Sequence, residues 1–366
     1  MPTLPLTMNA VLLEGHGGFD RLAYRTDLPV PTPGAGEVLV RVRAAGVNNT
    51  DINMRTGWYS KSVTVGSTAA GGAAGFLAAP VEDSGWTGTP LSFPRIQGAD
   101  ACGQIVAIGA TVDPARIGER VIIEPVFRQS LGAAGPAAEP VYFGSDCPGA
   151  FADYVSVPSV NAHRITSPLT DAELASFPCS YSAAENMLAR AGVRAGETVF
   201  ITGASGGVGS AAVQLARRRG SHVIALAAAE KAAEVRRLGA ARVLPRDADL
   251  VAAIARQSVD IVVDVVGGVQ FPALLEVLRR GGRYAVAGAI AGPIVELDLR
   301  TLYLKDLRLL GCTIPEPGVF ADLVGYIERG EIRPVVARTY PLAAIADAQR
   351  EFLTKRHTGK IVLLLG

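Results

Sequence analysis

The sequence predicts an α/β protein of two domains, one a β-rich domain of barrel type and the other a doubly wound parallel sheet. With 366 residues, the chain is long enough for more than one domain. Between residues 9 and 160, short strand candidates alternate with turns. From residue 197 onward, strand and helix patterns alternate, which is typical of a parallel sheet covered by helices on both faces.

The composition narrows the class of protein. Hydrophobic residues make up 49% of the chain and the formal net charge is +1, so a globular protein that binds neither nucleic acid nor a charged membrane surface is expected. The sequence has no run of eighteen apolar residues and no basic start followed by an apolar segment, so we expect neither a membrane span nor a secretory signal. The four cysteines are far apart and form no CxxC pair, which favours a cytoplasmic protein with reduced thiols.

The first part of the chain contains the strand candidates of the β-rich domain, at residues 38–42, 103–109 and 120–123. Two stretches rich in small residues, 67–94 and 130–140, show no sustained period and are predicted to be long loops. The longer of them begins close to Tyr59 and is a candidate for a lid over a substrate, or for an insertion without a role.

In the second part of the chain, predicted helices and strands alternate. A helical stretch capped by Asp171 is expected through Leu174, and it resumes over residues 182–190. Further strands are predicted at residues 199–202, 222–226, 242–244, 260–265, 283–287 and 360–365. Further helices are predicted at residues 209–219, 230–238, 271–279 and 343–353.

A glycine-rich stretch follows the first of these buried strands and leads into a helix. Strand, glycine turn and helix in this order form the first half of a dinucleotide-binding unit. Gly206 would let the backbone approach a pyrophosphate, Gly209 would let helix and strand pack closely, and the helix N-terminus would offer free N–H groups. The alternative is a tight structural turn. The predicted cofactor contacts here are Ala204, Ser205, Gly206, Gly207, Val208 and Gly209.

Three segments taken together resemble the medium-chain dehydrogenase/reductase superfamily. They are Ala44-Ala45-Gly46-Val47-Asn48-Asn49-Thr50-Asp51, Pro94-Arg95-Ile96-Gln97-Gly98-Ala99-Asp100-Ala101-Cys102-Gly103, and the glycine-rich stretch. The resemblance implies a GroES-like barrel domain, completed by the C-terminal segment, and a Rossmann dinucleotide-binding domain between. We therefore predict a GroES-like domain over residues 1–165 and 338–366 and a Rossmann domain over residues 166–337.

The resemblance also bears on zinc. Zinc alcohol dehydrogenases carry Cys and Gly-His-Glu where this chain has Asn48 and Gly98-Ala99-Asp100. Cys179 matches the third ligand, but a single thiolate does not make a catalytic zinc site, which needs three protein ligands. The chain thus resembles the zinc-less, quinone oxidoreductase-like branch, and no bound metal is expected.

By the same resemblance, Thr50 and Tyr59 are the candidate catalytic residues, since each could donate a hydrogen bond to a substrate oxygen. The alternatives are a helix cap for Thr50 and an ordinary core aromatic for Tyr59. Asn48 is expected to hydrogen-bond the cofactor near the nicotinamide ribose, and Asp51 to be a structural partner in the same turn. Ser182 is expected to replace a family threonine that faces the nicotinamide, or else this contact is lost.

The residues expected to bind the adenosine end of the cofactor favour NADPH over NADH. The second strand of the unit ends in small residues, Ala227 and Ala228, where NAD-binding units usually place an acid. Lys231 could pair with a 2′-phosphate, or could be a solvated residue in a helix's first turn. Lys360 could reach the pyrophosphate or face solvent. Further contacts are expected at the ends of later strands, from Val266, Gly267, Ala287, Gly288 and Ala289.

These features predict an NADPH-dependent oxidoreductase that transfers a hydride to a small molecule, a quinone or an α,β-unsaturated carbonyl, without zinc. A zinc-independent alcohol dehydrogenase-like enzyme and a non-catalytic NADPH-binding structural or regulatory protein are the alternatives. A homodimer is expected by analogy with relatives that pair the edge strands of their nucleotide-binding sheets. Residues 307–312, an apolar stretch, are the candidate edge.

Overall fold

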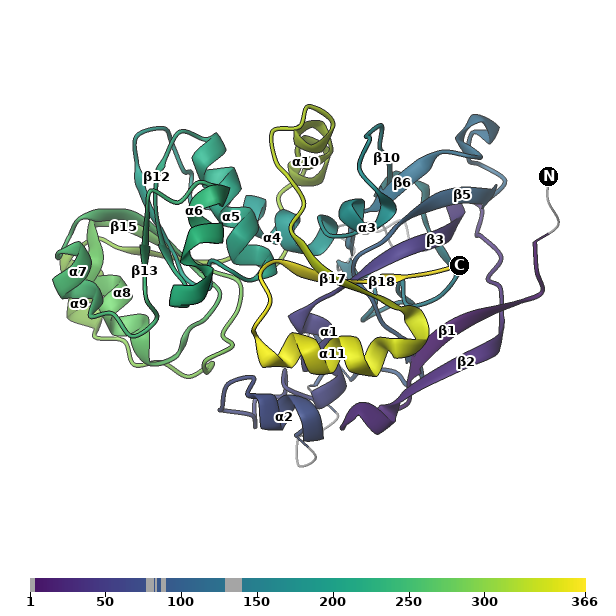
Figure 1. The fold of residues 1–366 in the computed structure, drawn as a ribbon, viewed down its shortest axis with the longest axis horizontal. Coiled ribbons are helices and arrows are strands. Elements are labelled where there is room, and N and C mark those ends of the chain that lie inside the picture. Colours follow the sequence, from purple (N-terminus) through teal and green to yellow (C-terminus); the bar gives the residue numbers. More distant parts are fainter. Residues whose placement is uncertain (1–3, 77–81, 83, 87–89, 129–139) are drawn as a thin grey trace.

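The computed structural model describes residues 4–76, 82, 84–86, 90–128 and 140–366. Figure 1 shows two lobes side by side along the long axis of the molecule, with the N-terminal strands in one and the parallel sheet in the other. Helix α4 (Pro178–Arg190) and the C-terminal strands β17 (Val336–Pro341) and β18 (Lys360–Leu364) lie between the two lobes. The expected α/β fold, with a GroES-like domain and a Rossmann domain, is confirmed.

The Rossmann lobe is built on a parallel sheet whose described strands follow the order β13-β12-β11-β14-β15-β16. This is a doubly wound order. The chain adds strands outward on one side of β11, then returns and adds them on the other side, starting with β14. In such sheets, ligands bind at the carboxyl edge, at the point between these two strands. The strands are β11 (Thr198–Ile201), β12 (His222–Leu226), β13 (Arg242–Leu244), β14 (Val259–Asp264), β15 (Leu278–Val286) and β16 (Arg308–Gly311).

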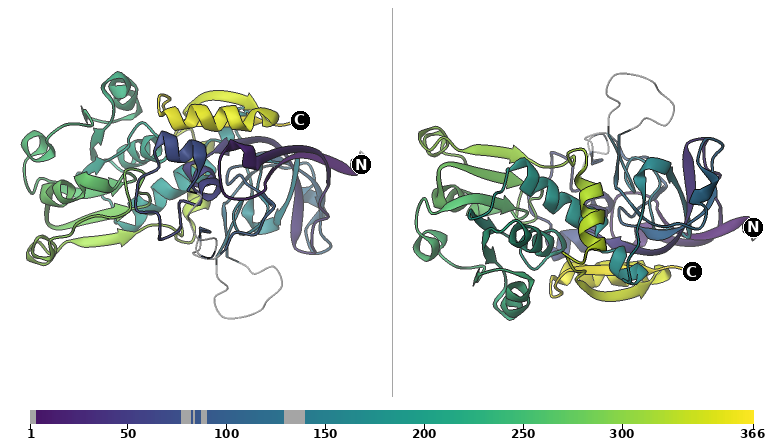
Figure 2. Two further views of the ribbon diagram at one scale, coloured as in Figure 1. Left: turned by 90° about the horizontal axis from the view of Figure 1, so that it is seen from below. Right: turned by 90° about the horizontal axis from the view of Figure 1, so that it is seen from above.

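Alternating side chains of β11 belong to two separate hydrophobic cores, because successive residues of a strand point to opposite faces. Val199 and Ile201 pack with Leu215, whereas Phe200 packs with Leu274 on the other face. The first core includes residues of α4, α5 (Gly207–Arg218), α6 (Ala232–Leu238) and α10 (Val319–Glu328). The second includes residues of α7 (Leu250–Ile254) and α8 (Phe271–Val277), and α9 (Leu299–Leu304) lies on the same side (Figure 2).

The other lobe contains a mixed sheet in the order β10-β6-β5-β3-β18-β17, with β9 paired to β3, and two smaller antiparallel sheets, β2-β1-β4 and β7-β8. Its N-terminal strands are β1 (Thr7–Leu13), β2 (Leu22–Pro29), β3 (Glu37–Val47), β4 (Arg95–Ile96) and β5 (Cys102–Ile108). They are followed by β6 (Arg120–Ile123), β7 (Val126–Phe127), β8 (Val141–Tyr142), β9 (Tyr154–Pro158) and β10 (Ala162–Arg164).

The C-terminal segment joins this lobe. Strand β18 runs antiparallel to the end of β3, pairing Ile361 with Val47 and Leu364 with Ala44, and runs parallel to β17 on its other side. Helix α11 (Ile345–Thr354) packs its buried face, including Ala348 and Phe352, into the same core. The C-terminal segment thus completes the GroES-like domain, as the resemblance implied. Strand β17 begins two residues before the predicted bound at residue 338, and the other domain bounds remain predictions.

Several local expectations were wrong. Helix α3 (Asp171–Leu174) is capped by Thr170, whose hydroxyl accepts the Glu173 N–H, so Asp171 is the first helical residue and not the cap. Helix α4 begins at Pro178, not at residue 182, because proline fits a helix's first turn, where its missing N–H costs nothing.

The range 67–94, predicted to be a loop, contains the short helix α2 (Ala69–Ala74), whose first turn is capped by the Thr68 hydroxyl. Most of the range 130–140 lies outside the described residues, so that prediction is not tested.

Other sequence expectations can be compared directly. All four cysteines are free thiols. In the part of the chain that the structure describes, no helix combines the length and apolar character needed to cross a bilayer. Strand β16, the predicted dimer edge, is the outermost strand of the parallel sheet, and pairing between two copies stays a prediction.

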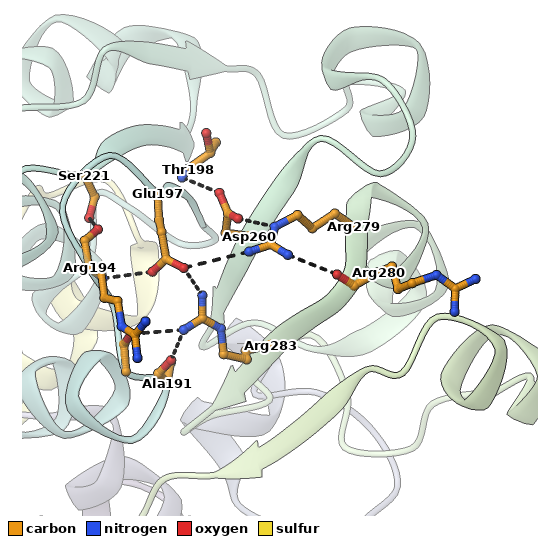
Figure 3. A network of polar contacts seen from close by, with 10 residues as sticks. Ala191, Arg194, Glu197, Thr198, Ser221, Asp260, Arg279, Arg280 and Arg283 are labelled. Carbon is orange, nitrogen blue, oxygen red and sulfur yellow. Dashed lines mark hydrogen bonds and ion pairs between the residues drawn. The ribbon is translucent and has the colours of Figure 1, made fainter.

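An ion-pair network at the amino edge of the parallel sheet ties the starts of three strands together (Figure 3). Glu197, just before β11, accepts the Arg194 N–H at 2.8 Å and pairs with Arg283 of β15. Asp260 of β14 accepts the Thr198 N–H at 2.8 Å and pairs with Arg279. The Glu197 and Arg283 side chains are only 17% and 14% exposed, so their pairing is weakly screened by solvent.

Replacing Glu197 with Gln should therefore lower the free energy of unfolding by about 1–3 kcal/mol, because Arg283 loses its charged partner in a partly buried place. Calorimetric unfolding would measure this. Asp306→Asn is the control, since its pair with Arg280 is 69% exposed on both sides and should contribute less than about 0.5 kcal/mol. Equal losses of unfolding free energy in the two variants would contradict the larger contribution expected from the buried pair.

Candidate active site

The glycine-rich turn after β11 leaves an open helix N-terminus at the carboxyl edge of the sheet. Gly203 has a φ of +56°, and Gly206 precedes the first residue of α5. A Cβ at Gly209 would lie 2.2 Å from the Gly203 carbonyl oxygen, so this position requires glycine. The Ser210 N–H donates to the Gly206 carbonyl at 2.9 Å, which leaves the N–H groups of residues 207–209 for a ligand.

The C-terminal segment closes one side of this turn. The Gly359 N–H donates to the Ser205 carbonyl at 2.9 Å, and Gly206 and Gly359 form a β-bridge. A Cβ at Gly207 would meet the Ser180 hydroxyl at 2.6 Å and the Lys360 side chain at 3.0 Å. Bare backbone, free N–H groups and an adjacent lysine together fit the pyrophosphate of a dinucleotide.

Lys360 is buried, so the alternative that it faces solvent is wrong. Its residue exposure is 2%, and its ammonium donates to Asp100 Oδ2 at 2.7 Å and to Asn48 Oδ1 at 2.5 Å. The Asn48 amide also donates to Asp100 Oδ2 at 2.8 Å, while Asp100 Oδ1 accepts the Cys179 N–H at 2.6 Å. Sequence reasoning singled out all four residues but missed their mutual pairing. Whether Asn48 also contacts a nicotinamide ribose stays a prediction.

The network includes Asn48 and touches the N–H of Cys179, two of the residues that the resemblance places at zinc-ligand positions, and its chemistry does not fit zinc. A lysine ammonium already bonds to the side chains of Asn48 and Asp100, and a cation would be repelled there. Among the described residues, no group of three or more His, Cys, Asp or Glu side chains could hold a metal ion.

The two candidate catalytic hydroxyls are hydrogen-bonded to each other. Helix α1 (Asn49–Thr56) has Asn48 as its N-cap, so the alternative that Thr50 caps it is wrong. The Tyr59 hydroxyl donates to Thr50 Oγ1 at 3.0 Å, while its ring packs with Leu13 and Met54. Burial raises the pKa of Tyr59 to about 12, so the phenol stays protonated at neutral pH and can act as a donor.

Asp51 behaves as the structural partner that the sequence suggested. Its Oδ2 accepts the Asn48 N–H at 2.7 Å, which fixes the start of α1. The carboxyl group is fully buried, and burial raises its pKa to about 7 in spite of the nearby Lys360 charge.

At the adenosine end, β12 is followed by Ala227, which is buried, and by Ala228. Lys231 is 6% exposed and donates to the carbonyls of Lys355 at 2.5 Å and His357 at 2.8 Å, so the alternative that it is solvated is wrong. Its ammonium faces the C-terminal segment, and its contact with a 2′-phosphate stays a prediction. Burial and, to a smaller extent, the charge of Arg246 lower the pKa of Lys231, so Arg246 is a second basic residue near this end that sequence reasoning missed.

The turns after β14 and β15 meet beside the glycine-rich turn. Asp264 Oδ1 accepts the Thr202 hydroxyl at 2.5 Å and the Val266 N–H at 2.8 Å, and the Gly267 N–H also reaches this carboxylate. The Ala287 N–H donates to the Asp264 carbonyl at 3.2 Å. Asp264 thus fixes the shape of the predicted cofactor-contact turn.

The remaining predicted contacts lie near these turns. A Cβ at Gly288 would lie 3.1 Å from the Val265 carbonyl, and one at Gly267 would lie 3.2 Å from the Ala289 side chain. Ser182 is different: its hydroxyl donates to the Cys179 carbonyl at 3.2 Å within α4, and the residue is 2% exposed.

Comparison with known proteins agrees with this geometry. Residues 34–167 match the family model of the alcohol dehydrogenase GroES-like domain, and residues 207–329 match that of the zinc-binding dehydrogenases. The chain belongs to the medium-chain dehydrogenase/reductase superfamily. Within it, the chain is an NAD(P)-dependent oxidoreductase.

Three relatives cover nearly the whole chain. Human (Homo sapiens) quinone oxidoreductase is 27% identical, with all of both chains covered. Acryloyl-coenzyme A reductase of Metallosphaera sedula is 26% identical over 97% of this chain and 99% of its own length. The structure of an alcohol dehydrogenase candidate from Sinorhizobium meliloti 1021 is 45% identical, covers 100% of this chain and 98% of its own, and superimposes with a TM-score of 0.87.

The raised pKa of Asp51 predicts a pH-dependent gain in stability for Asp51→Asn. A carboxyl whose folded-state pKa of about 7 lies above its ordinary 3.8 costs stability increasingly as pH rises between these values. The asparagine keeps an acceptor for the Asn48 N–H without the charge. The gain in unfolding free energy should grow from pH 5 to pH 8, to on the order of 2–4 kcal/mol. Thermal melts across this range would measure it, and a gain independent of pH would contradict the assignment.

Proposed function

We propose that this protein transfers a hydride from NADPH to a quinone or an α,β-unsaturated carbonyl without zinc. The observation that carries the proposal is the Lys360 ammonium bonded to Asp100 and to Asn48, which the resemblance places at a zinc-ligand position. The names of two relatives, quinone oxidoreductase and acryloyl-coenzyme A reductase, support this class of acceptor.

The bound nicotinamide would supply the hydride, which adds to a carbon of the acceptor. The protein's own task is then to orient the acceptor and to protonate the oxygen on which charge develops. Because Tyr59 donates to Thr50 Oγ1, the Thr50 hydroxyl proton is free to point at such an oxygen. Proton transfer from Thr50, refilled from Tyr59, balances the hydride, and a proton from solvent then restores the Tyr59 hydroxyl.

We further propose that NADPH is preferred to NADH. No acid stands at the end of β12 to bind the 2′-hydroxyl, since the strand leads directly into Ala227 and Ala228, and Glu230 comes two residues after them. Two cations, Lys231 and Arg246, are close to this position and to each other, which suits a 2′-phosphate.

The proposal predicts turnover by metal-free protein. After dialysis against a chelator, the protein should still oxidise NADPH with a panel of quinones and enones, and NADPH should give a higher kcat/KM than NADH. Metal analysis should find far less than one zinc per chain, because Lys360 holds the site. About one tightly bound zinc, or faster turnover of simple alcohols than of enones, would favour an alcohol dehydrogenase instead. NADPH binding without any turnover would favour the non-catalytic alternative.

The proton relay predicts a second result. Tyr59→Phe keeps the ring packing and removes the donor, so kcat should fall by roughly 10²-fold while the Kd for NADPH stays within about twofold. Tyr303→Phe, on an exposed tyrosine of α9, is the matched control and should change neither constant. A Tyr59→Phe enzyme with full kcat would remove Tyr59 from the mechanism.

A further inference from the structure

A group of basic residues, Lys231, Lys355 and His357, lies where the C-terminal segment meets the Rossmann domain. Burial and the charge of Lys231 lower the pKa of Lys355. Burial, together with the charges of Lys355 and Lys231, lowers the pKa of His357. Among the described residues, neither lysine forms an ion pair: Lys231 binds two backbone carbonyls, and Lys355 donates to Asn49 Oδ1 at 3.2 Å. Gathering cations without an anion costs free energy, so an anion is expected from outside the chain.

Two acids, Glu351 and Glu230, lie near this group; burial lowers the pKa of Lys231, and the charge of Glu230 offsets this in part. Glu351 of α11 pairs with Arg338 and accepts the Tyr340 hydroxyl. Glu230 precedes Lys231 on the exposed side of the same 3-10 turn. The nearby cation Lys360 is neutralised by Asp100. In the part of the chain that the structure describes, no carboxylate therefore compensates the charge of Lys355.

The neighbours of Lys355 in the chain and in space connect it to the predicted phosphate site. Its ammonium reaches Asn49, the first residue of α1, immediately after the Asn48 that bonds to Lys360. Four residues further along the chain, Gly359 pairs with the glycine-rich turn through the Ser205 carbonyl. The segment that begins at Lys355 thus reaches, at Gly359 and Lys360, the open N-terminus of α5, where a pyrophosphate would bind.

The backbone at Lys355 also argues for a role of its side chain. The residue ends α11 in the left-handed region, with a φ of 53°, where glycine or asparagine is favoured. The ammonium lies 4.1 Å from the centre of the Phe352 ring, which orients it without neutralising it. Lys355 is partly exposed, so a ligand can reach it.

We propose that Lys355 binds a phosphate group of the dinucleotide. This rests on the proposed cofactor, and it adds a binding residue from outside the Rossmann domain. Lys231, whatever its own contact with a 2′-phosphate, also holds this segment in place through the Lys355 and His357 carbonyls.

Binding should be linked to proton uptake. Burial and the Lys231 charge lower the pKa of Lys355 to about 8, so at pH 8.5 much of the free protein carries a neutral amine there. A phosphate favours the charged form and raises this pKa, so a proton is taken up as the cofactor binds. His357 does not contribute at this pH, because burial and the neighbouring lysines lower its pKa to about 4.

Titration calorimetry with NADPH and NADH tests the proposal on the full chain. Lys355→Met should raise the Kd roughly 10- to 100-fold, while Lys355→Arg should stay within about threefold of wild type. Lys305→Met is the matched control, because the Lys305 ammonium also binds backbone carbonyls, those of Leu275 and Glu276, but far from the glycine-rich turn. If Lys355→Met binds both cofactors more weakly, Lys355 binds the pyrophosphate. If it binds only NADPH more weakly, Lys355 binds the 2′-phosphate.

Repeating the titration at pH 8.5 in two buffers of different ionisation enthalpy gives a second readout, the number of protons taken up on binding. This number can be measured even if Lys355→Met does not fold. Wild type should take up a fraction of a proton, and Lys355→Arg should take up less, since arginine does not titrate there. Unchanged Kd values in Lys355→Met, or no proton uptake in wild type, would overturn the proposal. A wild-type protein that binds neither dinucleotide would instead count against the proposed function.

Discussion

The buried ion pair between Lys360 and Asp100 is the interaction on which the site depends. Its two side chains are 3% and 0% exposed, and a pair so deeply buried is stable only when its remaining polar atoms are also bonded. Here the amide of Asn48 and the N–H of Cys179 complete the set. The pair therefore joins β18, the start of α1 and the start of α4, three elements from distant parts of the chain.

This constraint explains why the candidate cofactor site and the candidate acid lie side by side. Asn48 caps the helix that carries Thr50, and Thr50 accepts the Tyr59 hydroxyl. Lys360 packs against Gly207 at the first turn of α5. A single charge pair thus fixes both the hydroxyls that would face a substrate and the helix end that would face a phosphate. A metal would have to displace this lysine before it could bind.

The sequence predicted much of the fold because its signals are local. Strands β6, β12 and β13 were predicted to the residue, since each is a short run rich in β-branched or apolar side chains. The surroundings of Lys231 and Lys360 could not be predicted, because their partners lie more than 100 residues away in the chain. Helix α2 was missed because its residues, Ala-Ala-Gly-Gly-Ala-Ala, have no amphipathic period. Among the candidate site residues, the pairing of Thr50 with Tyr59 was within reach of motif reasoning, whereas the role of Asp100 as the anchor of a lysine was not.

The position of β18 has a consequence for how the protein is made. Residues 44–47 of β3 pair with β18, which leaves the ribosome more than 300 residues later. At typical rates of translation, roughly 15 to 60 s pass between the two strands. During that time the first lobe lacks an inner strand of its main sheet and exposes an unpaired edge, which invites association with other nascent chains. Cells that make this protein in quantity would need either a chaperone that covers this edge or an early fold of the Rossmann domain that shields it.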